Sequence, residues 1–397
     1  MSRRNRAIGM DLPATAIILG REMDWTVSSI FWGLDAMDST IALYAGFLGL
    51  YILLASVVLS KLRTRLWSYL AVWTVYPLVG LWVAFFLGRD IFDALNLLAM
   101  AVFIGGVGLF AASAYFAWPL YKKFASVFMV FAVTLAVVGV DAFIVEPGWL
   151  EVRHEQVVSN KVHKPIRIAI MSDLQTDHVG GFERSVFKQI MAAKPDMVLL
   201  PGDYIQAYAS DYDNQVAKLR KIFQDLKVSA PLGIYATQGD AERPQQWTEI
   251  FKGLPVTTFP TSDTIVVPNT IEPKDGISLT ALTLKDSWRL NYKIPETENF
   301  HIVVAHRPDF MLTATEGDLF VAGHTHGGQV QIPFYGPLLT FSQAPREWCG
   351  GCCVTQEDGR SYVITRGVGM ERERAPRLRF FCRPEIVIVD VVPADGE

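Results

Sequence analysis

The stretch Ile168-Ala-Ile-Met-Ser-Asp173-Leu-Gln175 decides the fold of the second half of this chain. It is a short apolar run that ends in a carboxylate and an amide, and four runs of similar design follow it. They are Val198-Leu-Leu-Pro-Gly-Asp203, Ile234-Tyr-Ala-Thr-Gln-Gly-Asp240, Ile302-Val-Val-Ala-His306 and Phe320-Val-Ala-Gly-His324-Thr-His326. Side chains that follow the carboxyl ends of strands in an α/β sheet converge in one crevice. The five runs therefore predict a two-metal hydrolase site built on such a sheet.

The segments around these runs alternate between strand-like and helix-like patterns. Residues 166–171 and 197–200 are nearly uninterrupted apolar runs, as in strands buried on both faces. Between them, residues 182–193 have apolar side chains at helical spacing. Three later segments are rich in β-branched residues and favour a second sheet; they are residues 277–284, 362–365 and 386–392. We therefore expect an α/β fold with two packed mixed sheets flanked by helices.

The first part of the chain has a different composition. Hydrophobic residues make up 51% of the 397 residues and charged residues 19%, and the apolar excess lies before residue 147. Four almost uncharged runs have the length of a helix that crosses a hydrocarbon core of about 30 Å. They cover about residues 40–60, 66–88, 94–118 and 124–145. We expect a flank or interfacial helix at residues 1–39, an all-α bundle of about four transmembrane helices at 40–146, and a soluble domain at 147–397.

The charges of the short loops predict how the bundle is oriented. Five basic residues lie in the first and third loops between the apolar runs: Lys61, Arg63, Arg65, Lys122 and Lys123. Positive loops mark the cytoplasmic side, so the soluble domain would face the periplasm or the cell exterior. The basic start of the chain, at residues 3–6, argues for the opposite orientation. We expect an integral protein of the cell (inner) membrane, with the lipid bilayer as a partner.

The net charge of -4 provides no basic surface for nucleic acid, which is not expected as a partner. Six arginines nevertheless lie close together in the sequence, interleaved with Glu371 and Glu373. They are Arg366, Arg372, Arg374, Arg377, Arg379 and Arg383. One interpretation is a solvated hairpin with ion pairs. The other is a rim that holds phosphate groups through bidentate contacts, with Arg366 as the candidate substrate-binding residue.

The four cysteines follow residue 340 and are Cys349, Cys352, Cys353 and Cys382. The spacing of the first two resembles half of a zinc site, but the second pair that such a site requires is missing. Outside the cytoplasm, disulfides would be the expected use of these residues. Buried or free thiols remain an equal alternative, and the sequence leaves the pairing open.

Taken together, the five runs resemble the calcineurin-like metallophosphoesterase family, and in particular its membrane-anchored bacterial branch. The family pattern runs Asp-x-His, Gly-Asp, Gly-Asn-His, a lone His and Gly-His-x-His. The resemblance covers roughly residues 160–392 and extends to the segments 324–329, 365–369 and 379–385. It implies a four-layer α/β/β/α sandwich. It also implies a hydrolase that cleaves a phosphodiester or pyrophosphate bond by attack of a metal-bound hydroxide.

The resemblance further implies seven metal ligands, all carboxylate, amide or imidazole groups. Those of the first ion are Asp173, Gln175 and His326; those of the second are Asp240, His306 and His324; and Asp203 bridges the two. Ligands of these types suit two divalent ions of Mn, Fe or Zn.

Three positions depart from the family pattern. Gln175 stands in place of a histidine, and Asp240 in place of an asparagine. Ala241 replaces the histidine that in relatives steadies the transition state or protonates the leaving group, and a general acid contributes roughly 10²–10⁴-fold. His178, on the loop after the same strand as Asp173, could supply a catalytic imidazole; the alternative is an ordinary loop histidine. A substrate with a good leaving group would need no acid.

The membrane runs suggest an amphiphilic substrate, such as a phospholipid or a lipid-linked nucleotide or sugar. The aromatic segment 332–341 could accept acyl chains as a lid or could be a packed loop. A different class of function is a catalytically impaired family member that binds a phosphorylated ligand or regulates a partner, as the loss at Ala241 suggests. Transport through the bundle is disfavoured, because Asp141 is the only charge within the apolar runs and lies near an end.

Overall fold

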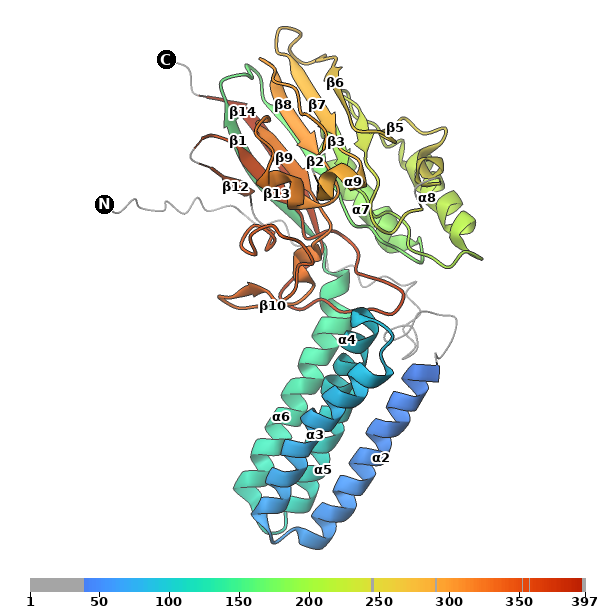
Figure 1. The fold of residues 1–397 in the computed structure, drawn as a ribbon, viewed down its shortest axis with the longest axis vertical. Coiled ribbons are helices and arrows are strands. Elements are labelled where there is room, and N and C mark those ends of the chain that lie inside the picture. Colours follow the sequence, from blue (N-terminus) through green and yellow to red (C-terminus); the bar gives the residue numbers. More distant parts are fainter. Residues whose placement is uncertain (1–38, 244–245, 290, 352, 357, 395–397) are drawn as a thin grey trace, which may run out of the picture.

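The computed structural model describes residues 39–243, 246–289, 291–351, 353–356 and 358–394. The flank expected at residues 1–39 lies outside the described residues except for Ser39, and Cys352 lies outside them as well. The described chain forms a bundle of long helices followed by a domain with two β-sheets (Figure 1).

Four helical segments of the bundle are long and apolar enough to cross a membrane, by length and composition. The first two are α2 (Ser39–Leu62) and α3 (Leu66–Leu87). The third is continuous through α4 (Ile91–Met100), the π-helical η1 (Ala101–Gly106) and α5 (Val107–Ala117). The fourth runs through α6 (Lys122–Val140), η2 (Asp141–Val145) and η3 (Glu146–Gly148). The outward faces of these helices are rich in Leu, Val and Phe, the reverse of a soluble bundle.

The two basic loops lie together at one end of the bundle. The Tyr121 hydroxyl, in the loop before α6, donates a hydrogen bond of 3.0 Å to the Thr64 carbonyl in the loop after α2. At the opposite end, Asp90 in the turn before α4 forms an ion pair of 3.2 Å with Arg374 of the sheet domain. The basic loops are therefore at the end of the bundle that points away from the sheets (Figure 1).

The first sheet has the strand order β1-β14-β2-β3-β4-β5. Its parallel half consists of β2 (Ile166–Ile170), β3 (Met197–Leu200), β4 (Ile234–Ala236) and β5 (Thr257–Thr258). The other strands are β1 (Glu151–Ser159) and β14 (Glu385–Pro393), which pair in parallel, and β14 is antiparallel to β2.

The prediction that residues 386–392 belong to the second sheet was wrong, because they form most of β14. This strand is buried on both faces, with Ile386 and Ile388 in the helix-covered core and Val387 and Val389 in the core between the sheets. A β-branched composition indicates a buried strand but does not determine which sheet provides its neighbours.

The second sheet has the order β12-β13-β9-β8-β7-β6. Its strands are β6 (Asp263–Val267), β7 (Ile277–Ala281), β8 (Phe300–Val304), β9 (Leu319–Ala322), β12 (Cys353–Thr355) and β13 (Ser361–Ile364). The four central strands are parallel, and β6 and β12 are antiparallel edge strands. A small hairpin of β10 (Gln331–Ile332) and β11 (Gly336–Pro337) lies apart from both sheets.

The two sheets face each other across a shared apolar core that includes Ile168, Val387 and Val321. The other face of the first sheet is covered by α7 (Gly181–Ala192), α8 (Tyr212–Leu226) and η4 (Trp247–Phe251). The short α9 (Leu284–Trp288) and η5 (Pro308–Leu312) pack over the outer face of the second sheet. The expected α/β class, with four layers preceded by an all-α bundle, is confirmed.

The bundle is joined to the sheet domain by more than its covalent link to β1. The Glu146 carboxylate, at the end of the fourth helical segment, accepts the backbone N–H groups of Phe381, at 2.9 Å, and Cys382. The Arg379 N–H donates to the carbonyl of Ala142 at 2.9 Å. A small apolar cluster of Ala142, Phe143 and Leu378 lies beside these bonds. The end of the bundle is therefore packed against the segment that precedes β14.

Candidate metal centre

The seven candidate ligands lie just beyond the carboxyl ends of five parallel strands. Asp173 and Gln175 follow β2, and Asp203 follows β3. The others come from the ends of β4, β8 and β9: Asp240, His306, His324 and His326. The two sheets present these strand ends on the same side, so the ligands converge from both layers.

The loops that carry the ligands have an unusual backbone. Five of the seven candidates adopt positive φ: Asp173 (52°), Gln175 (37°), Asp203 (58°), His324 (70°) and His326 (48°). Residues other than glycine rarely occupy this region, and such strain concentrates at functional sites. Gly202, also at positive φ, lies so close to the site that a Cβ there would meet the His306 Nδ1 at 2.7 Å. The tight loops therefore hold the ligands in a strained backbone conformation.

Two groups of ligand atoms are close enough to hold a metal ion, and they share His306. One group consists of Asp240, His306 and His324; the other of Asp173, Asp203 and His306. In the first, Asp240 Oδ2 is 2.9 Å from His324 Nδ1 and 3.4 Å from His306 Nε2. In the second, His306 Nε2 is 3.5 Å from Asp203 Oδ2.

Gln175 and His326 adjoin the second group. The backbone N–H of Gln175 donates to the Asp203 carbonyl at 2.9 Å, and His326 Nε2 is 3.8 Å from Asp173 Oδ1. The structure thus brings all seven candidates into one place.

Several buried polar atoms in this cluster have no hydrogen-bond partner, and they are the atoms that would coordinate a metal. They are Asp173 Oδ2, Gln175 Oε1, His306 Nε2 and the two ring nitrogens of His326, of which one would face the ion. An unsatisfied buried polar group costs about 1–3 kcal/mol, so a cluster of them requires a ligand to compensate. The donor set therefore fits the pair of divalent ions.

Neighbouring groups orient two of these ligands. His306 Nδ1 is 2.8 Å from the Pro201 carbonyl, which directs Nε2 toward the cluster. The Gln175 side-chain amide donates to Gln206 at 3.0 Å and to Glu371 at 3.1 Å. Both of its N–H groups are thereby used, and its buried Oε1 has no hydrogen-bond partner. Such an amide oxygen could coordinate an ion at the position where the family pattern has a histidine.

The electrostatics of the cluster favour a cation at its centre. Burial raises the pKa of Asp173 to about 6. Burial alone would lower the pKa of His306, but the carboxylates of Asp203 and Asp240 outweigh it and raise this pKa to about 10. Burial lowers the pKa of His326 well below its usual value and keeps that imidazole neutral. The carboxylates of Asp173, Asp203 and Asp240 thus lie close to His306, and their negative charges favour a proton or a metal ion at this imidazole.

The sequence patterns did not single out three residues that contribute to this site. Glu371 orients Gln175, as described above. Glu242 is fully buried and accepts the backbone N–H groups of Asp203 (3.2 Å) and Gly239 (2.9 Å), and burial raises its pKa to about 8. It joins the loops after β3 and β4. Arg307 places its Nη2 2.9 Å from Asp240 Oδ2 and its guanidinium 5.3 Å from the centre of the Trp288 ring.

Neither His178 nor Ala241 contributes a side chain to the two ligand groups. Ala241 contributes only its backbone N–H, which donates to Asp203 Oδ1 at 2.8 Å. His178 is exposed, and its backbone N–H is bonded to the Thr176 hydroxyl. Its imidazole lies near Asp211, whose pKa is lowered mainly by hydrogen bonds from neighbouring amides and slightly by His178. His178 is absent from both ligand groups, and its catalytic role stays a prediction.

The arginine-rich segment is not a solvated hairpin. Arg379 is fully buried and donates to the carbonyls of Gly369 and Cys382. Arg366 directs its guanidinium toward Glu385 and Glu151, at 2.6 and 2.8 Å, and its role in substrate binding stays a prediction. These arginines stabilise the loops beneath the ligands, because they supply hydrogen-bond donors to backbone carbonyls and to buried carboxylates that would otherwise be unsatisfied.

The cysteines take no part in the candidate metal groups of the described residues. Cys382 is a buried thiol whose Sγ lies 3.2 Å from the carbonyl of the ligand His326. Cys349 is also buried. The half zinc motif also includes Cys352, which lies outside the described residues.

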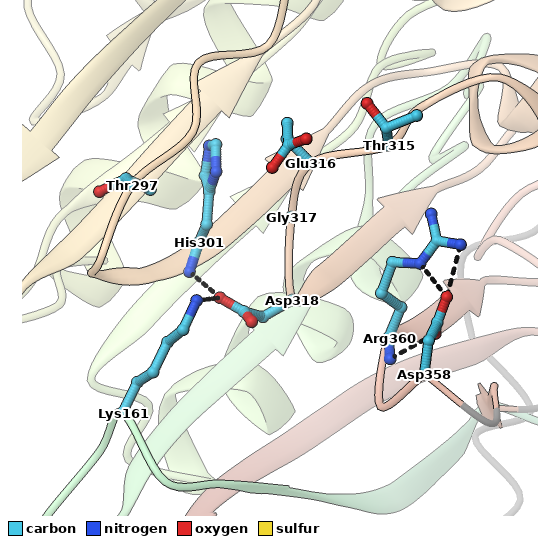
Figure 2. Close-up of a pocket in the computed structure, with 9 residues that line it drawn as sticks. All are labelled: Lys161, Thr297, His301, Thr315, Glu316, Gly317, Asp318, Asp358 and Arg360. Carbon is cyan, nitrogen blue, oxygen red and sulfur yellow. Dashed lines mark hydrogen bonds and ion pairs between the residues drawn. The ribbon is translucent and has the colours of Figure 1, made fainter.

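A cavity of roughly 360 Å³ lies elsewhere, at the opposite ends of β8 and β9 (Figure 2). Its lining includes His301, Lys161 and Asp318, and the last two form an ion pair of 2.9 Å. Arg360, also in the lining, pairs with Asp358 at 2.6 Å. The charges drawn in Figure 2 thus largely neutralise one another. The ligand cluster, with its unsatisfied atoms, is the better candidate for chemistry.

Comparison with known proteins agrees with this geometry. Residues 166–328 match the family model of the calcineurin-like phosphoesterases. The uncharacterized metallophosphoesterase YkuE of Bacillus subtilis is 30% identical over 217 residues, which cover 52% of this chain and 71% of YkuE. The chain belongs to the calcineurin-like metallophosphoesterase family. It is therefore a metal-dependent phosphoester hydrolase by family, and the described residues contain candidate metal-ligand groups.

Other similarities are weaker. Phosphodiesterase YaeI of Escherichia coli is 28% identical over 265 residues, which cover 62% of this chain and 90% of YaeI. Among solved structures, a dimetal phosphatase from Danio rerio is 10% identical, with a TM-score of 0.32 and coverage of 51% of this chain and 88% of that chain. The last similarity is too low to support an argument.

Proposed function

We propose that this metallophosphoesterase is anchored in a membrane and hydrolyses a phosphodiester or pyrophosphate bond of a lipid or lipid-linked substrate. The observation that carries the proposal is the short path from the ligands to the bundle. His324 Nε2 is 3.3 Å from the Phe341 carbonyl, and the Phe341 ring is 5.2 Å from that of Phe92 in α4. A phosphate headgroup could therefore reach the ligands while its acyl chains remain beside the helices.

The chemistry follows from the residues around the cluster. Two bound divalent ions would supply Lewis-acid charge and a nucleophile at neutral pH for in-line displacement at phosphorus. Glu242 and Glu371 hold the ligand-bearing loops and the Gln175 amide in position, so little reorganisation is needed on substrate binding. No imidazole stands at position 241 to protonate the leaving group.

Arg307 provides a positive charge beside the site. Its guanidinium contacts Asp240, itself a candidate ligand, and lies over the exposed Trp288 ring. Arginine stays protonated, so it cannot act as a general acid, but it can stabilise the charge that develops on phosphate oxygens. We infer that Arg307 performs the electrostatic part of the role of the histidine that Ala241 replaces.

Replacing this charge should slow the reaction. Arg307→Ala is expected to lower kcat on an aryl phosphodiester by about 10²-fold, the usual effect of removing one transition-state donor. Arg289→Ala is a matched control, because Arg289 lies over the same Trp288 ring, at 5.2 Å, but is exposed. Metal content is measured in parallel. An unchanged kcat with both ions bound would exclude Arg307 from the reaction.

Substrate class is tested by profiling the purified full chain in detergent. Phospholipids and lipid-linked pyrophosphates are compared with nucleotides and aryl phosphodiesters, each with Mn or Zn added. We expect kcat/KM to be highest for a lipid substrate. If only water-soluble esters were cleaved, a lipid substrate would be excluded, and the protein would be a phosphoesterase that acts on soluble substrates. Two bound ions without turnover on any substrate would favour the impaired, ligand-binding relative that the alanine at position 241 suggests.

The proposed orientation places the sheet domain on the periplasmic or outer side. It is supported by the position of both basic loops at the end of the bundle away from the sheets, since such loops stay in the cytoplasm. Alkaline phosphatase fused after residue 397 should then be active in cells. In a second fusion, green fluorescent protein takes the place of the phosphatase. If this fusion were fluorescent and the phosphatase fusion inactive, the orientation would be the reverse.

A further inference from the structure

The segment that contains the β10–β11 hairpin exposes an unusual number of large apolar side chains. Six of them within ten residues are between 45 and 111% exposed: Ile332, Phe334, Tyr335, Leu338, Leu339 and Phe341. We call this set the 332–341 surface. Soluble domains seldom expose so many contiguous apolar groups, and such patches mark membrane or protein contacts.

The position of the 332–341 surface indicates which of these contacts it makes. In Figure 1 the β10 strand lies at the level of the upper end of the fourth helical segment, where the bundle meets the sheet domain. Val330, directly before β10, packs on the apolar cluster around Phe143 of the fourth helical segment. On α6, Val137 and Val140 are 62% and 52% exposed, so the lipid-facing side of the bundle continues up to this level.

The chemistry of the surface also suits a lipid interface. Tyr335 combines an apolar ring with a polar hydroxyl, as side chains at the headgroup level commonly do. The guanidinium of Arg346, which is exposed, lies 3.7 Å from the centre of the Tyr335 ring. An arginine held in this way can bind lipid phosphate while the neighbouring aromatic side chains enter the acyl region.

From these observations we propose that the 332–341 surface inserts into the leaflet next to the sheet domain. The hairpin then holds the ligand-bearing His324 loop against the bilayer, because the Phe341 carbonyl contacts His324. This proposal rests on the membrane anchoring of the proposed function but not on the nature of the substrate. In this proposal the 332–341 surface contacts the lipid leaflet. The competing outcome is that a protein binds to the same surface.

A photo-crosslinking experiment on the full chain tests the insertion. A benzophenone amino acid replaces Phe334, and the protein is placed in nanodiscs of phosphatidylethanolamine and phosphatidylglycerol with an alkyne-tagged lipid tracer. The same replacement of Val137 on α6 is the positive control. Val266 on β6, which is 69% exposed on an edge of the second sheet, is the negative control.

We expect position 334 to capture lipid at least about tenfold more than position 266, since an apolar ring partitions into lipid by roughly that factor or more. Lipid capture at position 137 without capture at 334 would overturn the insertion but leave the anchoring intact. Capture of protein instead of lipid at 334 would also overturn it. Absence of lipid at both 137 and 334 would contradict the anchoring, and the insertion with it. Equal metal content in all variants shows that the domain is folded.

Discussion

Asp203→Ala is expected to abolish hydrolysis, with kcat lower by at least about 10³-fold, because we propose that this carboxylate would bridge the two ions and that its loss would disrupt the positions of both. Asp203 lies at the centre of the cluster. Its Oδ2 faces His306 at 3.5 Å, its Oδ1 accepts the N–H of Ala241, and its own N–H is held by Glu242. Asp203 thus contacts the ligand loops that follow β2, β4 and β8.

The measurement is steady-state kinetics on an aryl phosphodiester, with bound metal determined for each variant. Asp203→Asn serves as a conservative variant, because its side-chain oxygen can still accept from Ala241 while the negative charge is lost. It should also be strongly impaired. Asp263→Ala is the surface control, since Asp263 is exposed at the start of β6. Activity of Asp203→Ala close to that of the wild type would refute the assignment of this site.

The second large effect concerns stability and is expected for Glu385→Gln. Glu385 is fully buried at the start of β14 and pairs with Arg366 at 2.6 Å and Arg153 at 3.1 Å, each only 13% exposed. Removing one partner from such a buried network costs about 3–5 kcal/mol, because two guanidinium groups lose their one fully buried counter-charge and keep only the more exposed Glu151 and Glu155. For a domain of this size we expect the Tm to fall by about 10 °C.

The contribution of Glu385 should also depend on pH. Burial alone would raise the pKa of this carboxyl, but Arg366 and Arg153 more than compensate and hold it below its usual value. A lowered pKa in the folded state means that the contribution is complete above the ordinary carboxyl pKa of about 4.3 and is lost as the pH falls through the lower value. The difference in Tm between wild type and variant should therefore shrink on acidification below that range.

Thermal unfolding in detergent, followed by near-ultraviolet circular dichroism, measures both effects. Asp358→Asn is a suitable control, because the pair of Asp358 with Arg360 is exposed and should contribute nothing measurable. If Glu385→Gln melted at the wild-type temperature at neutral pH, the network beneath the ligand loops would have no role in stability.

Much of the site could be predicted from the sequence because its geometry is local. Each candidate ligand follows the end of an apolar run by one to four residues, and parallel strands bring such positions to one edge. The runs before Asp173, Asp203 and His306 form β2, β3 and β8, and their ligands converge as the pattern indicates. The division into apolar helices and an α/β domain is visible in composition alone.

Other features depend on contacts between segments far apart in the chain. Residues 386–392 have the composition of any buried strand, and only the pairing of β14 with β1 and β2 places them in the first sheet. Arg379 looks like a surface residue in the sequence but is buried by the loops around Gly369. Glu242 acts through backbone N–H groups of two loops, and no side-chain motif reveals such a role.

The central claim is that seven side chains from the two sheets hold two metal ions. Anomalous diffraction from crystals of the full chain loaded with Mn or Zn tests it most directly. We predict two peaks about 3.5–4 Å apart. The side chains expected around them are Asp173, Gln175, Asp203, Asp240, His306, His324 and His326. A single peak, or none at this cluster in metal-loaded crystals, would contradict the two-metal site.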